Sequence, residues 1–429
     1  MDCNTILVTG ATGYIASRLI PQLLDLGHTV RALARRPHQI GPRNWSAKID
    51  IFPGDVTNPA SLAPALKDVH TAYYLIHNMS SGHGYTQLEL EAARNFAQAA
   101  EEAGVKHIIY LGGLADEEQH IAPHMRSRIE TGATLRQGKV PVTEFRAGVV
   151  AGSGSISFEM IRFMTELFPI IPAPFWVKNK SQPISTQNVI DYFLAALDNH
   201  NGQGQVFEIG GPHVTTYQEL MLSYARVRGL NRRFLLLPYV PVWFMAFGIG
   251  LTTPVPSPIA YALVGGLSSD SVVMHDDARK IYPEVDLIDF ESATREALMR
   301  LHPHKIERIW DDRDGQNKIL KHEGFFIDHR EIKVDTTPEK MFNAVKNMGG
   351  WFTIETIGEN QVLVCLKMKT PGQGWVEWKK GRASSYLAQT VFFTPRGLAG
   401  FLFWYLLYPF WAVVFNRWLK NIAHNSVVK

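Results

Sequence analysis

Gly10 and Gly13 are the residues whose type and spacing indicate chemistry most directly. They follow the apolar, β-branched run 5–9 and precede an apolar helical pattern. A glycine at 10 permits a sharp turn after a strand. A glycine at 13 lets backbone N–H groups approach a pyrophosphate, whose charge the following helix N-terminus stabilises. The sequence therefore predicts a dinucleotide-binding turn made of Gly10, Thr12, Gly13, Tyr14 and Ile15.

The surroundings of these glycines make the prediction more specific than spaced small residues alone would be. Ala16 stands where the strict fingerprint has a third glycine, and it is small enough to let the helix pack closely on the strand. The apolar positions after it recur with helical spacing, at Leu19, Ile20, Leu23 and Leu24. A strand, a glycine turn and a helix are thus expected in the order that a dinucleotide site requires.

Two adjacent arginines indicate which dinucleotide the site prefers. NAD sites place a carboxylate about 20 residues beyond the glycines, but this sequence has no Asp or Glu between Asp25 and Asp50. Arg35 and Arg36 follow the predicted strand 29–34, where their guanidinium groups could pair with a 2′-phosphate. We therefore expect NADP(H) to be favoured over NAD(H). The alternative is that the two arginines form only a solvated basic turn.

Strand and helix patterns alternate through the first 150 residues, as a doubly wound parallel α/β sheet requires. The predicted elements after the first turn are the strands 48–52, 72–77, 107–111 and 142–150 and the helix 88–102. Ligands of such sheets bind at the carboxyl ends of the strands. This rule places five residues around the cofactor, with the first two as expected adenine contacts: Asp55, Val56, His77, Asn78 and Gly112.

Composition limits the class of protein. A chain of 429 residues has room for two or three domains. Its net charge of +3 and the lack of a dense basic face with interleaved aromatic residues argue against nucleic-acid binding. The two cysteines, Cys3 and Cys365, have no metal-ligand spacing, so we expect reduced thiols, no metal site and a cytoplasmic protein. No signal-peptide apolar region precedes the first predicted strand.

Three motifs resemble those of extended or atypical short-chain dehydrogenases of the NmrA-like, NAD(P)-binding type. They are Thr9 to Ala16, Gly54 to Val56, and Arg146 to Val150. The resemblance implies a Rossmann-type NAD(P)-binding domain over residues 1–300, with a substrate lobe at 158–300. It further implies a linker at 301–324 and, at 325–429, a small α+β domain of unknown function with a START-like (polyketide-cyclase-like) shape.

The same resemblance identifies candidate catalytic residues. The family normally carries a Ser before a Tyr-x-x-x-Lys pair, and the matching positions here are Gly112, His124 and Arg128. An imidazole titrates near neutral pH, so His124 could transfer a proton, whereas Arg128 stays charged and could bind the ribose. Tyr85 is a second candidate acid. The alternative is that His124 and Arg128 only anchor the cofactor and that Tyr85 is a lid contact.

Two long segments without charge need a structural explanation. The run Phe234–Ser269 contains several prolines and is interpreted either as an apolar lid over a pocket for a hydrophobic substrate or as plain core. The run Gly397–Phe415 is long enough to cross a membrane. Pro409 and the cations Arg417 and Lys420 after the run argue against a span. A packed helix and a helix lying in the membrane interface, at the cytoplasmic face, are the other interpretations.

Three hypotheses of function follow from these observations. The first is an NADPH-dependent oxidoreductase that acts on a hydrophobic carbonyl or enone. The second is an NADP(H)-binding sensor or scaffold without turnover. The third is a membrane-associated protein that binds a lipid or isoprenoid through its C-terminal domain. All three predict an apolar small-molecule ligand or a bound dinucleotide, and none involves nucleic acid.

Overall fold

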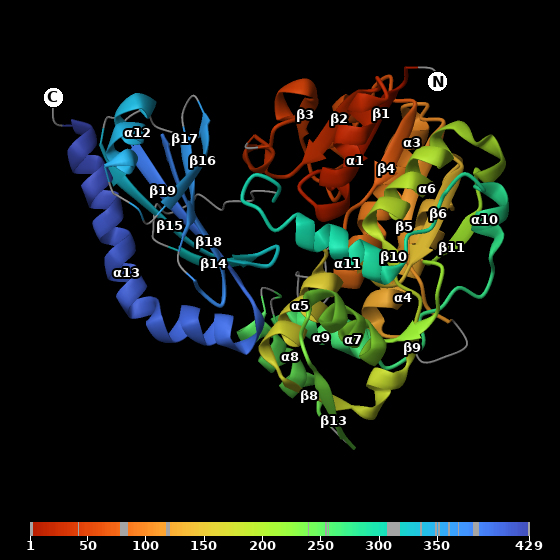
Figure 1. Cartoon of the computed structure of the whole chain (residues 1–429). Coiled ribbons are helices and arrows are strands. Elements are labelled where there is room, and N and C mark those ends of the chain that lie inside the picture. The colour runs from red at the N-terminus through yellow and green to blue at the C-terminus, as the bar shows by residue number, and fades with distance from the viewer. Residues whose placement is uncertain are drawn as a thin grey trace.

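The fold was analysed in a computed structural model of the chain, which has two bodies joined along one side (Figure 1). One body is built on a parallel sheet and carries a helical lobe, and the other is built on an antiparallel sheet. The structure describes residues 3–41, 43–77, 85–116, 121–238, 240–253, 255, 257–306, 318–334, 337–347, 350, 352–358, 361–367, 369–380 and 386–427.

The N-terminal body contains a parallel sheet of seven strands in the order β11-β6-β5-β4-β1-β2-β3. The strands are β1 (Thr5–Thr9), β2 (Thr29–Ala34), β3 (Asp50–Pro53), β4 (Thr71–Tyr74), β5 (His107–Gly113), β6 (Val142–Ala147) and β11 (Val206–Ile209). The chain order reverses between β1 and β4, so the sheet is doubly wound and its ligand crevice lies at the carboxyl ends of these strands. The predicted α/β fold class is confirmed.

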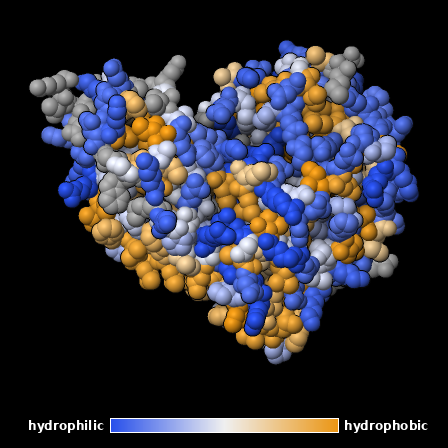
Figure 2. Space-filling view, in the orientation of Figure 1, coloured by the Kyte–Doolittle hydropathy of each residue, from blue (hydrophilic) through white to orange (hydrophobic). Residues whose placement is uncertain are grey.

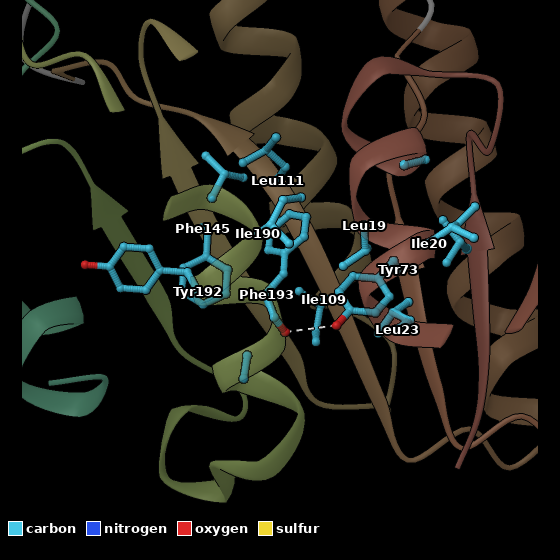
Figure 3. Packing of buried hydrophobic residues seen from close by; sticks show 14 of the residues in the cluster. Leu19, Ile20, Leu23, Tyr73, Ile109, Leu111, Phe145, Ile190, Tyr192 and Phe193 are labelled. Atoms are coloured by element: carbon cyan, nitrogen blue, oxygen red, sulfur yellow. Dashed lines mark hydrogen bonds between the residues drawn. The ribbon is translucent and has the colours of Figure 1, made fainter. Parts of the chain in front are cut away.

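Helices cover both faces of this sheet. Buried residues of α1 (Tyr14–Asp25) and α6 (Thr186–Asp198) form one core with the sheet, in which Leu19, Phe193 and Tyr73 pack together (Figure 3). The Tyr73 hydroxyl donates to the carbonyl of Phe193, so the polar atom of this buried ring has a hydrogen-bond partner. The second core involves α2 (Ala63–Leu66), α3 (Tyr85–Glu102) and α4 (Pro123–Leu135).

The helical lobe follows β6 and is interrupted by short strands. Its helices are α5 (Ile156–Leu167), α7 (Tyr217–Arg228), α8 (Val242–Thr252), α9 (Ser257–Gly266) and α11 (Phe290–Met299), whereas α10 (Asp277–Ile281) packs on β11 of the parallel sheet. Its paired strands are β8 (Ile170–Pro174) with β13 (Arg233–Leu237), β7 (Val150–Ala151) with β10 (Ile184–Ser185), and β9 (Lys180–Ser181) with β12 (Thr215–Thr216). The uncharged run Phe234–Ser269 therefore comprises most of β13 and the two short helices α8 and α9.

The C-terminal body is an antiparallel sheet of six strands in the order β14-β15-β19-β18-β17-β16. Its elements are β14 (Lys318–His322), β15 (Phe325–Lys333), α12 (Pro338–Lys346), β16 (Phe352–Gly358), β17 (Gln361–Leu366), β18 (Gly372–Lys380), β19 (Tyr386–Pro395) and α13 (Gly397–Val427). Because β14 pairs with β15, the sheet begins within the segment 301–324, which was wrongly expected to be only a linker. Its START-like character stays a prediction.

The long helix α13 packs on this sheet with one side only. Trp404, Phe415 and Leu419 are buried against the sheet and α12, whereas Leu406, Phe410 and Val413 are 60–71% exposed. In the part of the chain that the structure describes, α13 is the one helix long and apolar enough to cross a membrane, judged by length and composition. Its contact with the sheet favours the packed helix among the predicted alternatives, and leaves one apolar side uncovered.

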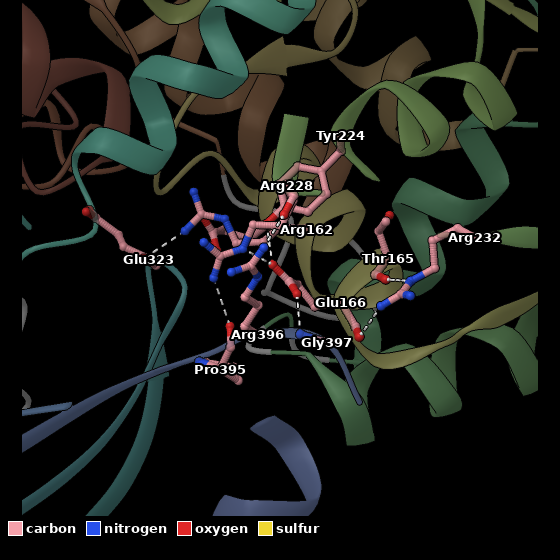
Figure 4. Close-up of polar contacts among 11 residues, drawn as sticks. Arg162, Thr165, Glu166, Tyr224, Arg228, Arg232, Glu323, Pro395, Arg396 and Gly397 are labelled. Atoms are coloured by element: carbon pink, nitrogen blue, oxygen red, sulfur yellow. Dashed lines mark hydrogen bonds and ion pairs between the residues drawn. The ribbon is translucent and has the colours of Figure 1, made fainter. Parts of the chain in front are cut away.

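The two bodies are joined by buried polar contacts (Figure 4). Glu166 of α5 accepts hydrogen bonds from Arg228 Nε at 2.7 Å and from the backbone N–H of Gly397 at 2.6 Å. The guanidinium of Arg228 also donates to the carbonyl of Pro395. Arg162, likewise on α5, donates to the carbonyl of Glu323 in the β14–β15 turn. Helix α5 thus anchors to the helical lobe the end of the C-terminal sheet where β15 begins and its neighbour β19 ends.

Candidate functional site

The turn between β1 and α1 has the shape that the glycine spacing predicts. Gly10 has φ +63°, and a Cβ added there would lie 2.4 Å from the carbonyl oxygen of Leu75, so only glycine fits. The N–H of Gly13 donates to the carbonyl of Gly10 at 2.7 Å. Gly13 is the N-cap of α1 and provides no side-chain hydrogen bond. The first-turn N–H groups of α1 therefore remain directed at a ligand, as pyrophosphate binding requires.

Arg43, which the sequence analysis did not single out, holds this turn. Its Nη2 donates to the carbonyl of Thr12 at 3.0 Å, and its guanidinium lies 5.3 Å from the centre of the Trp45 ring. Only 6% of Arg43 is exposed, so a positive charge is fixed beside the predicted pyrophosphate site. Arg43 belongs to irregular chain after β2, where no periodicity could have revealed its position.

Tyr14 and Ile15 face the site through their backbone at the start of α1. The Tyr14 hydroxyl lies 2.9 Å from Thr186 Oγ1, and burial raises the pKa of this phenol. The ring is therefore engaged with α6, away from the glycine turn. Binding by the first-turn amides remains the predicted role of these two residues.

Arg35 and Arg36 directly follow β2, and both are exposed. Neither side chain forms a hydrogen bond or ion pair with another described residue. Asp55 follows β3, and its Oδ1 accepts hydrogen bonds from the N–H and hydroxyl of Thr57 at 3.0 and 2.9 Å. Val56 is buried in the core, so it can offer only its backbone to a ligand. The geometry is compatible with the predicted adenosine end of the site, which stays a prediction.

His77 and Arg128 meet where β4 and β5 end. Arg128 Nη2 donates to His77 Nε2 and to the carbonyl of Leu111, both at 3.3 Å. Burial, and then the charge of Arg128, hold the pKa of His77 well below its usual range, so its imidazole is neutral. Two predicted residues, His77 and Arg128, are thus brought together. Asn78 lies outside the described residues.

His124 lies one turn before Arg128 on α4 and is 6% exposed. Its ring packs on Gly266 of α9, where an added Cβ would lie 2.8 Å from His124 Cε1. Its buried Nδ1 has no hydrogen-bond partner among the described residues. Burial, followed by the charge of Arg128, lowers the pKa of His124 to about 4. The expectation that this imidazole titrates near neutral pH is therefore wrong, because His124 is neutral at pH 7.

Gly112 is packed against an ion pair inside the sheet. A Cβ there would lie 2.7 Å from Glu144 Oε1, which is bonded to Arg146 Nε. The neighbouring Gly113 is the residue that faces the site, because its Cβ would lie 3.0–3.4 Å from Met125 and Arg128. Gly112 therefore has no room for the serine hydroxyl of the usual catalytic set. The side chain of the candidate acid Tyr85 lies outside the described residues.

A large cavity begins at the carboxyl end of β5 and extends under the helical lobe. It encloses about 1210 Å³, its open mouth included. Much of its lining is apolar and comes from α5, β8, α8 and α9, with Met160, Met164, Met245, Ile249, Trp176 and Leu263 among the residues. His124 and Arg128 of α4 also belong to the lining. The inner sides of α8 and α9 form one wall, as the apolar-lid interpretation of this run expects.

The described residues contain no group of three or more His, Cys, Asp or Glu side chains that could hold a metal ion. The residues gathered at the sheet edge are instead those of a dinucleotide site.

A doubly wound sheet with this glycine turn defines a dinucleotide-binding α/β protein. Residues 2–262 match the model of the NmrA-like family, and the chain belongs to this family of NAD(P)-binding Rossmann-type proteins. The match ends before the C-terminal body and so does not test its START-like resemblance.

Individual relatives were also found. A (4-alkanoyl-5-oxo-2,5-dihydrofuran-3-yl)methyl phosphate reductase from Streptomyces griseus is 28% identical over 236 residues, covering 53% of this chain and 76% of the reductase. The photosystem II assembly factor Ycf39 from Cyanophora paradoxa is 25% identical, covering 56% of this chain and 73% of that protein. An NADPH-dependent quinone oxidoreductase from Escherichia coli, in complex with NADPH, superposes with a TM-score of 0.55 at 19% identity, covering 68% of this chain and 99% of that structure.

Proposed function

We propose that this protein is an NADP(H)-dependent reductase of a hydrophobic carbonyl compound or enone. One observation carries the proposal: His124, whose buried Nδ1 has no hydrogen-bond partner among the described residues, and Arg128 both line a largely apolar cavity beside the carboxyl ends of the parallel strands. Apolar lining with a few placed polar groups is typical of a site for a hydrophobic substrate.

The residues present fit NADP(H). The turn at Gly10 has the tight backbone conformation that only glycine fits, and the amides of α1 would hold the pyrophosphate. Arg35 and Arg36 would pair with the 2′-phosphate, and Arg128 would bind near the nicotinamide ribose. When bound, the cofactor supplies a hydride.

His124 and Arg128 would act on the substrate oxygen. A neutral imidazole can donate a hydrogen bond from a ring N–H, and a guanidinium stabilises negative charge that develops on oxygen. The final proton would come from water, because a neutral imidazole that gave up its only N–H proton would become an imidazolate anion. The pKa of about 4 means that His124 is not cationic at neutral pH, so it acts as a hydrogen-bond donor before any proton moves.

The relatives support a reductase. The Streptomyces protein is named as a reductase, and the structural neighbour from Escherichia coli is a quinone oxidoreductase bound to NADPH. Both names agree with an oxidoreductase that uses a nicotinamide cofactor, and the quinone agrees with an apolar, oxygen-bearing substrate.

The test is NADPH oxidation by the purified protein with a panel of apolar quinones, enones and aldehydes. We expect substrate-dependent oxidation, and His124→Phe should lower kcat by about 100-fold because a transition-state hydrogen bond is lost. NADPH affinity, followed by its fluorescence, should be unchanged in this variant. His124→Gln, which restores an N–H donor, should recover part of kcat. Equal kcat in wild type and His124→Phe would refute the role of His124.

A second candidate is an NADP(H)-binding protein without turnover. The specific observation is that arginine and histidine replace the usual lysine and tyrosine, and that one relative is named as an assembly factor. Tight NADPH binding with no oxidation across the panel would favour this function over the reductase.

A further inference from the structure

Helix α8 is apolar on both of its sides. Ala246 and Ile249 are buried at 3% exposure, within the core under the helical lobe. Trp243, Phe247 and Leu251 point the other way and are 59–68% exposed. A helix that is apolar all round belongs either in a protein core or in contact with lipid. In the part of the chain that the structure describes, the outer side of α8 therefore leaves Trp243 and Phe247 exposed.

Helix α13 has an uncovered apolar side as well. Leu402, Leu406, Phe410 and Val413 are 46–71% exposed. Helices α8 and α13 both contact α5, so they lie close together although they are far apart in the chain. Figure 2 shows hydrophobic colour along the lower left edge, where α13 runs, and at the lower end of the molecule, near β13. We call the outer sides of α8 and α13 the apolar edge.

The charged residues at the ends of the two uncharged runs are positive, apart from Asp270, whose Oδ1 accepts a hydrogen bond from the N–H of Lys180. No charged residue occurs in 234–269 or in 397–416. Arg233 and Arg396 are exposed and precede the two uncharged runs directly, while Arg417 and Lys420 are exposed after the second run. Glu166, the carboxylate at this junction, is buried and paired with Arg228. Apolar side chains bordered by long cations suit the interface of an anionic bilayer, where cations reach the headgroups.

We propose that the apolar edge docks this protein on the surface of an anionic lipid bilayer, with α8 and the first half of α13 lying in the interface. Helix α13 does not cross the bilayer, since its other side is buried on the antiparallel sheet. The inner sides of α8 and α9 line the large cavity, so a lipophilic substrate would reach it from the bilayer through this edge. That route rests on the proposed reductase function, whereas the docking does not.

The experiment is flotation of the full chain with phosphatidylcholine vesicles, with and without about one third phosphatidylglycerol. We expect binding to the anionic vesicles. Phe247→Asp on α8 and Phe410→Asp on α13 should each weaken binding about tenfold or more, because a carboxylate replaces a buried apolar ring. Arg233→Gln should weaken it roughly fivefold, and only with anionic vesicles. Met274→Asp is the matched control, at 62% exposure on a loop bonded to Glu208 of the edge strand β11, and should bind like wild type.

Each variant is first checked for NADPH affinity and melting temperature, so that loss of fold is separated from loss of docking. Failure to float with either vesicle, or wild-type flotation of both aspartate variants, would overturn the proposal. A wild-type dimer that Phe410→Asp converts to a monomer would overturn it too, because a second copy would then cover the edge. Absence of turnover would leave the flotation result unaffected.

Discussion

The predicted preference for NADP(H) over NAD(H) depends on two side chains, Arg35 and Arg36. Both are exposed directly after β2, and the sequence has no Asp or Glu between Asp25 and Asp50. Substituting each by Ala removes one charge-assisted contact to a 2′-phosphate, worth roughly 1–3 kcal/mol. We expect NADPH affinity to fall about tenfold or more for each variant, while NADH affinity stays constant.

Titration of NADPH and NADH into wild type and both variants measures this change. Arg279→Ala on α10, an exposed arginine beside β11 at the opposite edge of the sheet, serves as the control. If the unmodified protein bound both dinucleotides equally, the predicted preference would be wrong and the arginines would be only a solvated turn.

At the scale of elements, the pairing of β5 with β6 contains a buried histidine. His107 Nε2 lies 2.8 Å from Thr143 Oγ1, whose hydroxyl donates to the carbonyl of Gly202. The imidazole therefore donates to Thr143 and is neutral. Burial, followed by the charges of other histidines, lowers the pKa of His107 to about 4. The folded chain thus binds fewer protons here than the unfolded chain between pH 4 and 6.5.

The sign of the effect follows from this difference in protons. The unfolded state gains a proton on His107 first, so the free energy of unfolding decreases as pH falls from about 6.5 to about 4. Replacing His107 by Gln keeps an N–H donor for Thr143 and removes the titration. Urea unfolding across this window should show a slope shallower by up to about 1.4 kcal/mol per pH unit. The exposed His38→Gln serves as control, and an unchanged slope in His107→Gln would contradict the prediction.

The elements that could be predicted from sequence are those with strong periodicity. The β-branched runs and the glycine turn located β1, α1 and β2, and alternation located β15. β14 was not predicted, because its residues lie in a charged segment and become a strand only by pairing with β15. Arg43 was missed because it acts from irregular chain, and the low pKa of His124 depends on burial by α9, which no local pattern encodes.

At the scale of the whole molecule, the contact between the two bodies depends on one buried carboxylate. Glu166 is 3% exposed, and its Oε1 accepts from the Tyr224 hydroxyl at 2.9 Å as well as from Arg228. Its Oε2 accepts from the N–H of Gly397, the first residue of α13. These contacts tie α5 and α7 of the helical lobe to the helix that carries half of the apolar edge (Figure 4). Loss of Glu166 should therefore destabilise the start of α13.

Glu166→Ala leaves the Arg228 guanidinium buried without its carboxylate and removes the acceptor of the Gly397 N–H. Breaking such a buried pair by removing one partner costs about 3–5 kcal/mol, so we expect a loss of this size in the free energy of unfolding. Hydrogen exchange should also speed up first in the amides at the start of α13, because that end loses its anchor. Glu101→Ala, which breaks the exposed pair with Lys139, should change neither quantity measurably. Equal stability and equal exchange in Glu166→Ala and Glu101→Ala would show that apolar packing against α5, and not this carboxylate, holds the two bodies together.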